Sequence, residues 1–495
     1  MPKLGQSMSA KLKDYVNRFP DFKTDGKVLF CKVCSKAVSA GKIFAVKQHM
    51  ESAKHLQLAS RSKTKMTTQQ LLGEQTIEDM EYKFASDLCN TFIAADIPLY
   101  KVRHTEIRKF LEKYTDHHVP CETTLRSKYV KAHYQATIDH IISSVRDHFL
   151  WLSIDETTDA AGRYVTNCII GILNDDEVSC KTRFLLNTAA LDSANHFTIA
   201  RFFDDSIKLL GDEFDKNKIL LFVSDAAPYM VKAAQAIQIF YPKITHLTCL
   251  AHGIHRVCEK IRSVYPNVDR LVSNIKKVFS KSPSRIQIFR NQVPDLELPP
   301  SPIITRWSTW IRAVNYYAQN FEKIVALFDL LNKEEAASIE IAHELLLNPT
   351  VRNDIIFISS NYGFLEESIT KLLMIGQTLS EQIMIVMDAI HRVGCIRSQT
   401  ANPIKEKFSN LLEKNVGFTV LRNISAFLTG LCDQNETRTD KYSISETLAF
   451  KFAPITSIDV ERSFSMYKNV FKANRHSFLF ENLKELFVIY CNKNL

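Results

Sequence analysis

Two pairs of metal-binding residues lie close together near the start of the chain. Cys31 and Cys34 are separated by two residues, and His49 and His55 follow after fourteen more, with five residues between them. Thiolates and imidazoles in this order and spacing are typical ligands of a tetrahedral structural zinc site. The sequence therefore predicts a Cys2His2 zinc finger that binds Zn²⁺ through Cys31, Cys34, His49 and His55.

The spacing also sets requirements on the local structure of this finger. The two cysteines need a tight turn after the short strand KVLF, and the two histidines need a helix. That helix must end or distort near residues 52–54, because His55 has to turn back towards the same ion. We expect Phe30 and Phe44 to form a small apolar core, which a finger of this size cannot maintain without zinc. Two unrelated pairs are the alternative, and the basic surroundings disfavour it.

Three acidic residues further along the chain could form a second metal site. Asp155 ends the first of several apolar strands, Asp225 ends the fourth, and Glu461 lies in the helical segment SIDVERSFS. Carboxylates that meet at one edge of a sheet can hold two Mg²⁺ or Mn²⁺ ions for phosphoryl transfer. A single aspartate at a strand end more often caps a turn. The order of all three along the fold favours the catalytic interpretation.

The elements that would position these acids alternate in a recognisable order. Three β-rich runs at 148–155, 164–173 and 179–191 precede a helix near 195–210. A fourth strand at 218–226, a helix at 228–240 and a short fifth strand at 245–251 come next. This βββαβαβα order predicts an RNase H-like mixed sheet. From 261 to 445 only amphipathic helical patterns occur.

We therefore predict an α+β multidomain chain with five parts. They are a basic zinc finger at 1–66, a helical intermediate domain at 67–145, the first part of the RNase H-like core at 146–260, an all-helical insertion at 261–445, and a C-terminal part with the last core helix at 446–495.

Positive charge is concentrated at the N-terminal end. Residues 1–70 hold fourteen Lys or Arg and four Asp or Glu, although the whole chain has a net charge of only +9. A basic excess at one end suits a segment that binds a polyanion. We expect Lys42, Lys47 and Lys54 of the finger to contact DNA. A solvated basic tail without a partner is the alternative.

Composition excludes several other classes of protein. Hydrophobic residues make up 45% of the chain and charged residues 24%, which is a globular balance. The eleven scattered cysteines favour a reducing compartment, and the N-terminal residues lack an apolar signal segment. No run of about 18 uninterrupted apolar residues occurs. We expect several folded domains and no membrane partner.

Further motifs resemble a known family. In chain order they are SIDETTDAAGRYV, VSDAAPYMVKAA, CLAHGIHRV, RWSTW and PITSIDVERSFSMYKNVFKANR. Together they resemble hAT-superfamily DNA transposases from about residue 80 onwards. The finger resembles BED-type fingers, in particular that of the CGG-repeat-binding protein. The resemblance implies that Asp155, Asp225 and Glu461 form a DDE triad, with Cys249 and His252 as a structural pair beside it.

The resemblance also implies contacts with DNA and with a second copy of the chain. Arg306 and Trp307 would contact DNA, with the indole stacked on a base flipped out of the helix. A buried core tryptophan is the alternative for Trp307, and we expect Trp310 to be buried. The C-terminal segment is similar to the family's dimerisation region. Its candidate interface anchors, which as ordinary core would look the same, are Phe464, Phe471, Leu483 and Phe487.

The leading hypothesis is a nuclear hAT-type DNA transposase that forms a homo-oligomer. Its rival is a catalytically silent, transposase-derived DNA-binding regulator. The motif SDAAPYM lacks the asparagine that family members commonly carry after the aspartate, and the helical insertion is short, which both suit the rival. An RNase H-like nuclease acting on RNA hybrids is a third hypothesis, but it does not explain RWSTW.

Overall fold

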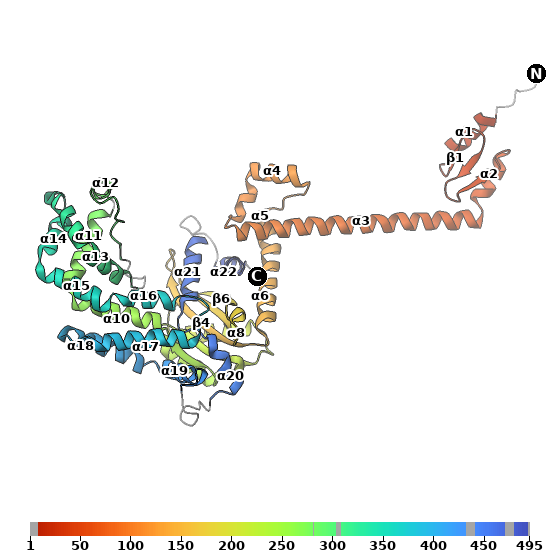
Figure 1. Ribbon diagram of the computed structural model, residues 1–495. Helices are drawn as coiled ribbons and strands as arrows, with labels where there is room; N and C mark the ends of the chain where they lie inside the picture. The colour runs from red at the N-terminus through yellow and green to blue at the C-terminus, as the bar shows by residue number, and fades with distance from the viewer. Residues whose placement is uncertain (1–7, 281, 303–307, 432–440, 471–479, 494–495) are drawn as a thin grey trace, which may run out of the picture. The chain divides into compact units, whose positions relative to one another are not determined.

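The computed structural model describes residues 8–280, 282–302, 308–431, 441–470 and 480–493, with the side chains of these ranges except those at 60–78 and 179–180. The chain divides into two compact units (Figure 1). One comprises Met1–Thr91 and Leu99–Leu125, and the other Phe92–Pro98 and Arg126–Leu495. Within the described ranges, no helix is both long and apolar enough to cross a membrane.

The first unit begins with a small α+β module. Its elements are α1 (Met8–Arg18), β1 (Phe22–Thr24), β2 (Leu29–Cys31), β3 (Lys36–Val38), α2 (Ile43–Met50) and the start of the long helix α3 (Ala53–Ala94). The three strands form an antiparallel sheet in the order β1-β2-β3. The core of this module consists of Leu12, Tyr15, Phe22, Leu29, Cys31, Ala40 and Val46.

The prediction that Phe30 and Phe44 form this core is wrong. Phe30 is 41% exposed and Phe44 is 69% exposed. Side chains alternate along a strand, so Phe30 faces away from the core that its neighbours Leu29 and Cys31 enter. Val46, which is fully buried, takes the core position on α2.

The rest of the first unit is helical. After α3 come η1 (Leu99–Arg103), α4 (Thr105–Thr115) and α5 (Glu122–Thr124). Arg108 of α4 donates a hydrogen bond to the carbonyl of Val119 at 2.7 Å. His117 stacks on Phe84 of α3, with 4.8 Å between the ring centroids, and its Nδ1 lies 3.1 Å from the Glu81 carboxylate. These contacts fold the α4 segment back onto α3.

The second unit is built around a five-stranded mixed sheet with the strand order β6-β5-β4-β7-β8. The bounds are β4 (Phe149–Thr158), β5 (Tyr164–Leu173), β6 (Arg183–Leu191), β7 (Ile219–Ser224) and β8 (Thr245–Thr248). The first three strands pair antiparallel, whereas β4–β7 and β7–β8 pair parallel. Every residue of β7, with the sequence ILLFVS, is buried, as expected for a parallel strand covered on both faces.

Helices from both ends of the unit pack on this sheet. They are α6 (Lys131–Val145), α7 (Glu177–Cys180), α8 (His196–Lys208), α9 (Pro228–Phe240), α21 (Ile458–Val470) and α22 (Phe480–Cys491). The π-helical turn η2 (Leu125–Val130) opens α6, and the short helix η3 (Lys216–Lys218) precedes β7. α21 contacts β4 and β5, and α22 contacts β6 and α6. The side chain of Asn492 bonds both the N–H and the carbonyl of Leu185, at 3.1 and 3.0 Å. The C-terminal segment is therefore part of the sheet domain.

The packing of the C-terminal segment bears on the candidate interface anchors. Phe464, Leu483 and Phe487 are at most 4% exposed and belong to the core of their own chain. Their burial matches the alternative that they are ordinary core residues, and the contact with a second copy stays a prediction. Phe471 lies outside the described residues.

Helices also occupy the stretch between the sheet strands and α21. Their bounds are α10 (Leu250–Val264), α11 (Pro266–Phe279), α12 (Pro283–Gln292), α13 (Thr309–Asp329), η4 (Lys333–Glu335), α14 (Ala337–Leu347), α15 (Pro349–Tyr362), α16 (Phe364–Leu372), α17 (Leu379–Cys395), η5 (Gln399–Ala401), α18 (Asn402–Glu413), α19 (Val416–Leu428), α20 (Ile444–Ala449) and η6 (Phe450–Phe452). Trp310 is buried among them, as predicted.

α19 approaches the sheet very closely. A Cβ on Gly417 would lie 2.1 Å from the carbonyl oxygen of His246 in β8, so only glycine fits at this position. The side chain of Asn415 accepts a hydrogen bond from the N–H of Thr248 and donates one to its carbonyl, at 3.2 and 2.7 Å. The helical stretch is thereby fixed to the end of β8, next to the residues that come after β7.

Candidate functional site

The four predicted zinc ligands converge in the first unit. Cys31 ends β2, and Cys34 follows in a turn in which its N–H donates to the Cys31 Sγ at 3.3 Å. His49 lies on α2, which ends at Met50, and His55 lies in the first turn of α3. The four ligand atoms all lie within 4.8 Å of one another. The break between the two helices allows both imidazoles to face the thiols, as the spacing requires.

The surroundings of these side chains fit a zinc ion. The His55 Nδ1 lies 3.4 Å from each cysteine Sγ, and its Nε2 lies 3.4 Å from the carboxylate of Asp21. A carboxylate on the second ring nitrogen is a common way to orient a metal-binding histidine. The His49 Nε2 is buried without a hydrogen-bond partner. Burial and the neighbouring His55 lower the pKa of His49, which favours the neutral imidazole that binds metal.

The exterior of the finger carries the lysines that we expect to contact DNA. Lys42, Lys47 and Lys54 are all exposed. Among the described residues, none of the three forms an ion pair with a carboxylate. Their charges are therefore available to phosphate groups, and their role in DNA binding stays a prediction.

The sheet of the second unit brings the three predicted acids together. Asp155 is in β4 and Asp225 comes directly after β7, and these strands run parallel with Ser153 opposite Val223. The same register continued by two residues sets the two aspartates side by side at one edge of the sheet. Glu461 lies in the first turn of α21, which packs over β4 and β5. Among the described residues, only the finger forms a compact set of metal-type ligands, so the carboxylates are neighbours without closing around one point.

The electrostatics of this carboxylate cluster reflect the crowding of like charges. Burial, together with the charges of Glu461 and Asp225, raises the pKa of Asp155 well above its ordinary value. Burial would also raise the pKa of Glu461, but the nearby His252 and a hydrogen bond with Asp155 lower it overall. The pKa values of these two acids are therefore shifted in opposite directions, and a bound cation would favour the ionised form of both.

Cys249 and His252 lie directly beside this cluster. The His252 Nε2 is 3.5 Å from the Glu461 carboxylate, and its Nδ1 is 3.4 Å from the Ser457 Oγ. The Cys249 Sγ accepts a hydrogen bond from the Ser457 N–H at 3.2 Å. Burial alone would lower the pKa of His252, but Cys249, Glu461 and Asp155 raise it overall. The histidine is a cation that holds Glu461 in place.

Sequence reasoning missed Glu156 and Tyr229. The Tyr229 hydroxyl on α9 donates a hydrogen bond to the Glu156 Oε1, while the Glu156 Oε2 is buried without a partner. Burial and Asp225 raise the pKa of Glu156 to about 7. The tandem acids in SIDE were the available signal. Because side chains alternate along a strand, the sequence assigns Glu156 to the opposite face of the sheet from Asp155. Asp225 comes close to both acids because β7 pairs parallel with β4.

The predicted DNA contacts Arg306 and Trp307 lie outside the described residues. The residue after them, Ser308, donates its N–H to the Nδ1 of His255 at 3.4 Å. His255 lies on α10, one turn beyond His252. Ser308, the first described residue after them, therefore lies against α10.

Comparison with models of protein families gives a match. A family model described as a domain of unknown function (DUF659) matches residues 120–279. This domain is associated with hAT-like transposase-related proteins. The matched residues include Asp155, Asp225, Cys249 and His252, but not the finger or Glu461. No curated protein matches the chain by sequence.

The cluster of Cys31, Cys34, His49 and His55 leads to a direct prediction about zinc. Replacing Cys34→Ser removes one of four ligands, so the purified chain should lose its zinc and the finger should unfold, because zinc binding supplies most of the folding free energy of such modules. Zinc content is measured by atomic absorption, and folding of the finger by protease sensitivity at 8–55. Cys395→Ser, which changes an exposed cysteine of the second unit, is the control. Full zinc occupancy in Cys34→Ser would rule out the assigned ligand set.

The raised pKa of Glu156 leads to a prediction about pH. In the unfolded state Glu156 loses its proton around pH 4.5, whereas in the folded state it keeps the proton up to about pH 7. The free energy of unfolding therefore falls as the pH rises from about 4.5 to about 7. Glu156→Gln removes this loss and should stabilise the second unit at pH 8 by about 1–3 kcal/mol. Calorimetry at pH 5 and pH 8 measures the free energy of unfolding of each variant. The exposed Glu344→Gln on α14 is the control, and equal pH dependence in both variants would contradict the assignment.

Proposed function

We propose that the chain is a hAT-type DNA transposase that cuts and joins DNA at a DDE site formed by Asp155, Asp225 and Glu461. One observation carries the proposal. Three acids from separate parts of the chain meet at one edge of a mixed sheet, where burial beside each other raises the pKa of Asp155. A fold seldom crowds carboxylates in this way unless they bind a cation or a substrate.

The architecture supports an RNase H-like core for the second unit. The strand order β6-β5-β4-β7-β8, with three antiparallel strands followed by two parallel ones, is the arrangement expected of that fold. Helices between β8 and α21 support an insertion that separates Glu461 from the two aspartates in sequence. We keep the domain boundaries 1–66, 67–145, 146–260, 261–445 and 446–495 as part of this proposal.

The donor set fits hard divalent cations. Carboxylate oxygens are the ligands that Mg²⁺ and Mn²⁺ prefer, and Asp155, Asp225 and Glu461 would hold them. The bound ions would supply charge stabilisation for the attacking and leaving oxygens of phosphoryl transfer. His252 lowers the pKa of Glu461 and orients it through their 3.5 Å contact. Cys249 and Ser457 hold His252 from the other side, so we assign this group a positioning role.

The remaining parts of the proposal concern DNA, location and assembly. The basic finger would bind DNA, with Arg306 and Trp307 acting close to the cut site, and the protein would work in the nucleus. A homo-oligomer remains part of the proposal. Because Phe464, Leu483 and Phe487 are buried within their own chain, we place its contacts on the exposed residues of the chain.

A catalytically silent DNA-binding regulator is the second candidate function. The Asp225 Oδ1 accepts a hydrogen bond from the Ala227 N–H at 3.0 Å, so this carboxylate also stabilises the turn before α9. The motif SDAAPYM lacks the asparagine that hAT family members commonly carry after the turn that contains the aspartate. Both observations are compatible with a chain that retains the fold and the finger without cleaving DNA.

DNA cleavage distinguishes the two candidates. The full chain, with Mg²⁺ or Mn²⁺, should nick a duplex that carries the inverted repeats flanking its reading frame. Asp155→Asn and Glu461→Gln should each lower the rate by roughly 100-fold or more, because they remove charge that acts on the transition state. Duplex binding, measured by fluorescence anisotropy, should not change. Glu481→Gln, on the exposed side of α22, is the matched control.

Each outcome of this experiment has a clear meaning. Undiminished cleavage by Asp155→Asn would refute the assigned triad. Tight binding of the repeats by the unmodified protein, without cleavage under any divalent ion, would favour the regulator.

A further inference from the structure

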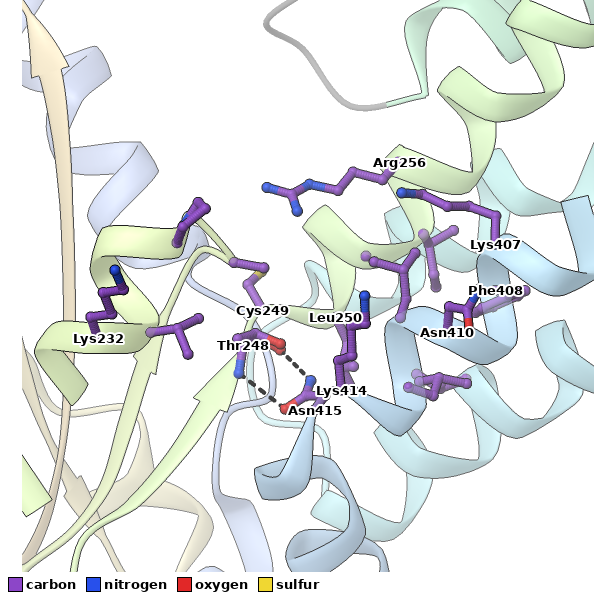
Figure 2. A pocket seen from close by; sticks show the side chains of 18 of the residues that line it. Lys232, Thr248, Cys249, Leu250, Arg256, Lys407, Phe408, Asn410, Lys414 and Asn415 are labelled. Atoms are coloured by element: carbon purple, nitrogen blue, oxygen red, sulfur yellow. Dashed lines mark hydrogen bonds between the residues drawn. The ribbon is translucent and has the colours of Figure 1, made fainter. Parts of the chain in front are cut away.

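A groove begins beside the carboxylate cluster and is not used by the chemistry described above. Its main cavity has a volume of about 650 Å³ and lies between α9 on one side and α10 with α18 on the other (Figure 2). A second cavity of about 630 Å³ shares Arg256, Lys407 and Asn410 with it. The two cavities form one continuous groove along α10 and α18.

The rim of the main cavity is positively charged, whereas the second cavity carries Glu259 and Glu406 beside Lys260. Lys232 comes from α9, Arg256 from α10, Lys407 from α18, and Lys414 from the turn after α18 (Figure 2). None of these four cations forms an ion pair among the described residues. By contrast, Arg262, two turns further along α10, is paired with Asp269 at 2.6 Å. The rim therefore presents unneutralised charge to an anionic ligand.

The floor of the groove is apolar and bears an amide. Leu250, Ile254, Phe408 and Leu411 contribute apolar surface, and the exposed side chain of Asn410 lies among them. An apolar floor accepts the flat face of a nucleobase, and an amide can bond to its edge. The bases of an intact duplex are stacked inside, so they could not reach this floor. Each cavity has the volume of a drug-sized ligand, which corresponds to about one or two nucleotides.

The groove reaches the same end of the sheet as the acids. Ala226, the residue after Asp225, lines its wall, and so do Thr248 and Cys249 at the end of β8. Cys249 is bonded to Ser457, which also contacts His252. A strand in the groove would therefore lead directly to the carboxylate cluster.

We propose that this groove binds unpaired nucleotides of single-stranded DNA, with phosphates on the basic rim and bases on the apolar floor. The inference rests on the proposed function, because it assigns the groove to the strand next to the site of cleavage. It identifies the substrate as DNA that is locally unpaired at that site.

The test measures binding of a fluorescent twelve-nucleotide oligothymidylate to the full chain without added magnesium. The double variant Arg256→Ala with Lys407→Ala should weaken binding at least tenfold. It should also lower the slope of log affinity against log salt by about 1.4, since each phosphate contact contributes about 0.7 for single strands. Lys323→Ala, an exposed lysine on α13, is the matched control. Binding of a duplex should change less than twofold.

A second variant tests the floor without removing charge. Asn410→Trp fills the groove, so it should weaken oligothymidylate binding at least fivefold while the salt slope stays unchanged. The thermal unfolding midpoint of each variant verifies that it is folded. Unchanged affinity in both folded variants would overturn the proposal.

The remaining outcomes separate this proposal from the proposed function. One outcome is that the groove variants lose oligothymidylate binding while the unmodified protein never cleaves DNA. This would support the groove and refute the transposase. Cleavage that depends on Asp155, with groove variants that bind as the unmodified chain does, would refute the groove alone. Poly-glutamate that competes as strongly as oligothymidylate would identify an acidic protein partner and overturn the assignment to DNA.

Discussion

The burial of Asp155 among other acids is the constraint on which the second unit depends. A carboxylate removed from water beside two like charges destabilises the fold unless a proton or a cation neutralises it. The sheet tolerates this because other contacts hold the acids in place. Asn167 of β5 donates to the Ser463 hydroxyl of α21 at 2.7 Å, and Arg183 of β6 binds Asp459 at 2.5 Å. These bonds fix Glu461 over the two aspartates.

Positively charged side chains lie next to the acids. His252 lies against Glu461 and is itself held by Cys249 and Ser457, so one internal cation compensates part of the negative charge. Beyond Cys249 the lining changes to the basic rim of the groove. In the proposed function, the negative charge would bind metal ions and the adjoining positive charge would bind phosphates, as phosphoryl transfer on a polyanion requires. The module with the Cys and His cluster carries exposed lysines in the other unit.

Sequence reasoning predicted the features that depend on local pattern and failed where tertiary contacts decide. The strand order and the four Cys and His residues of the finger were readable, because alternation, turn residues and ligand spacing are local. The burial of Val46 in place of Phe44, and the packing of Phe487 inside its own chain, depend on distant segments that pattern alone does not locate. The contact of Tyr229 with Glu156 and the basic rim of the groove also depend on segments that are distant in the sequence. Arg306 and Trp307 lie outside the described residues, so their predicted role is unchanged.

The most direct test of the central claim is to locate bound Mn²⁺ in crystals of the full chain by anomalous scattering. The account predicts anomalous density contacted by Asp155, Asp225 and Glu461 in the unmodified protein, and its loss in Asp155→Asn with the sheet intact. Density for Mn²⁺ only at other acids, or an unchanged peak in Asp155→Asn, would contradict a shared metal site at the sheet edge.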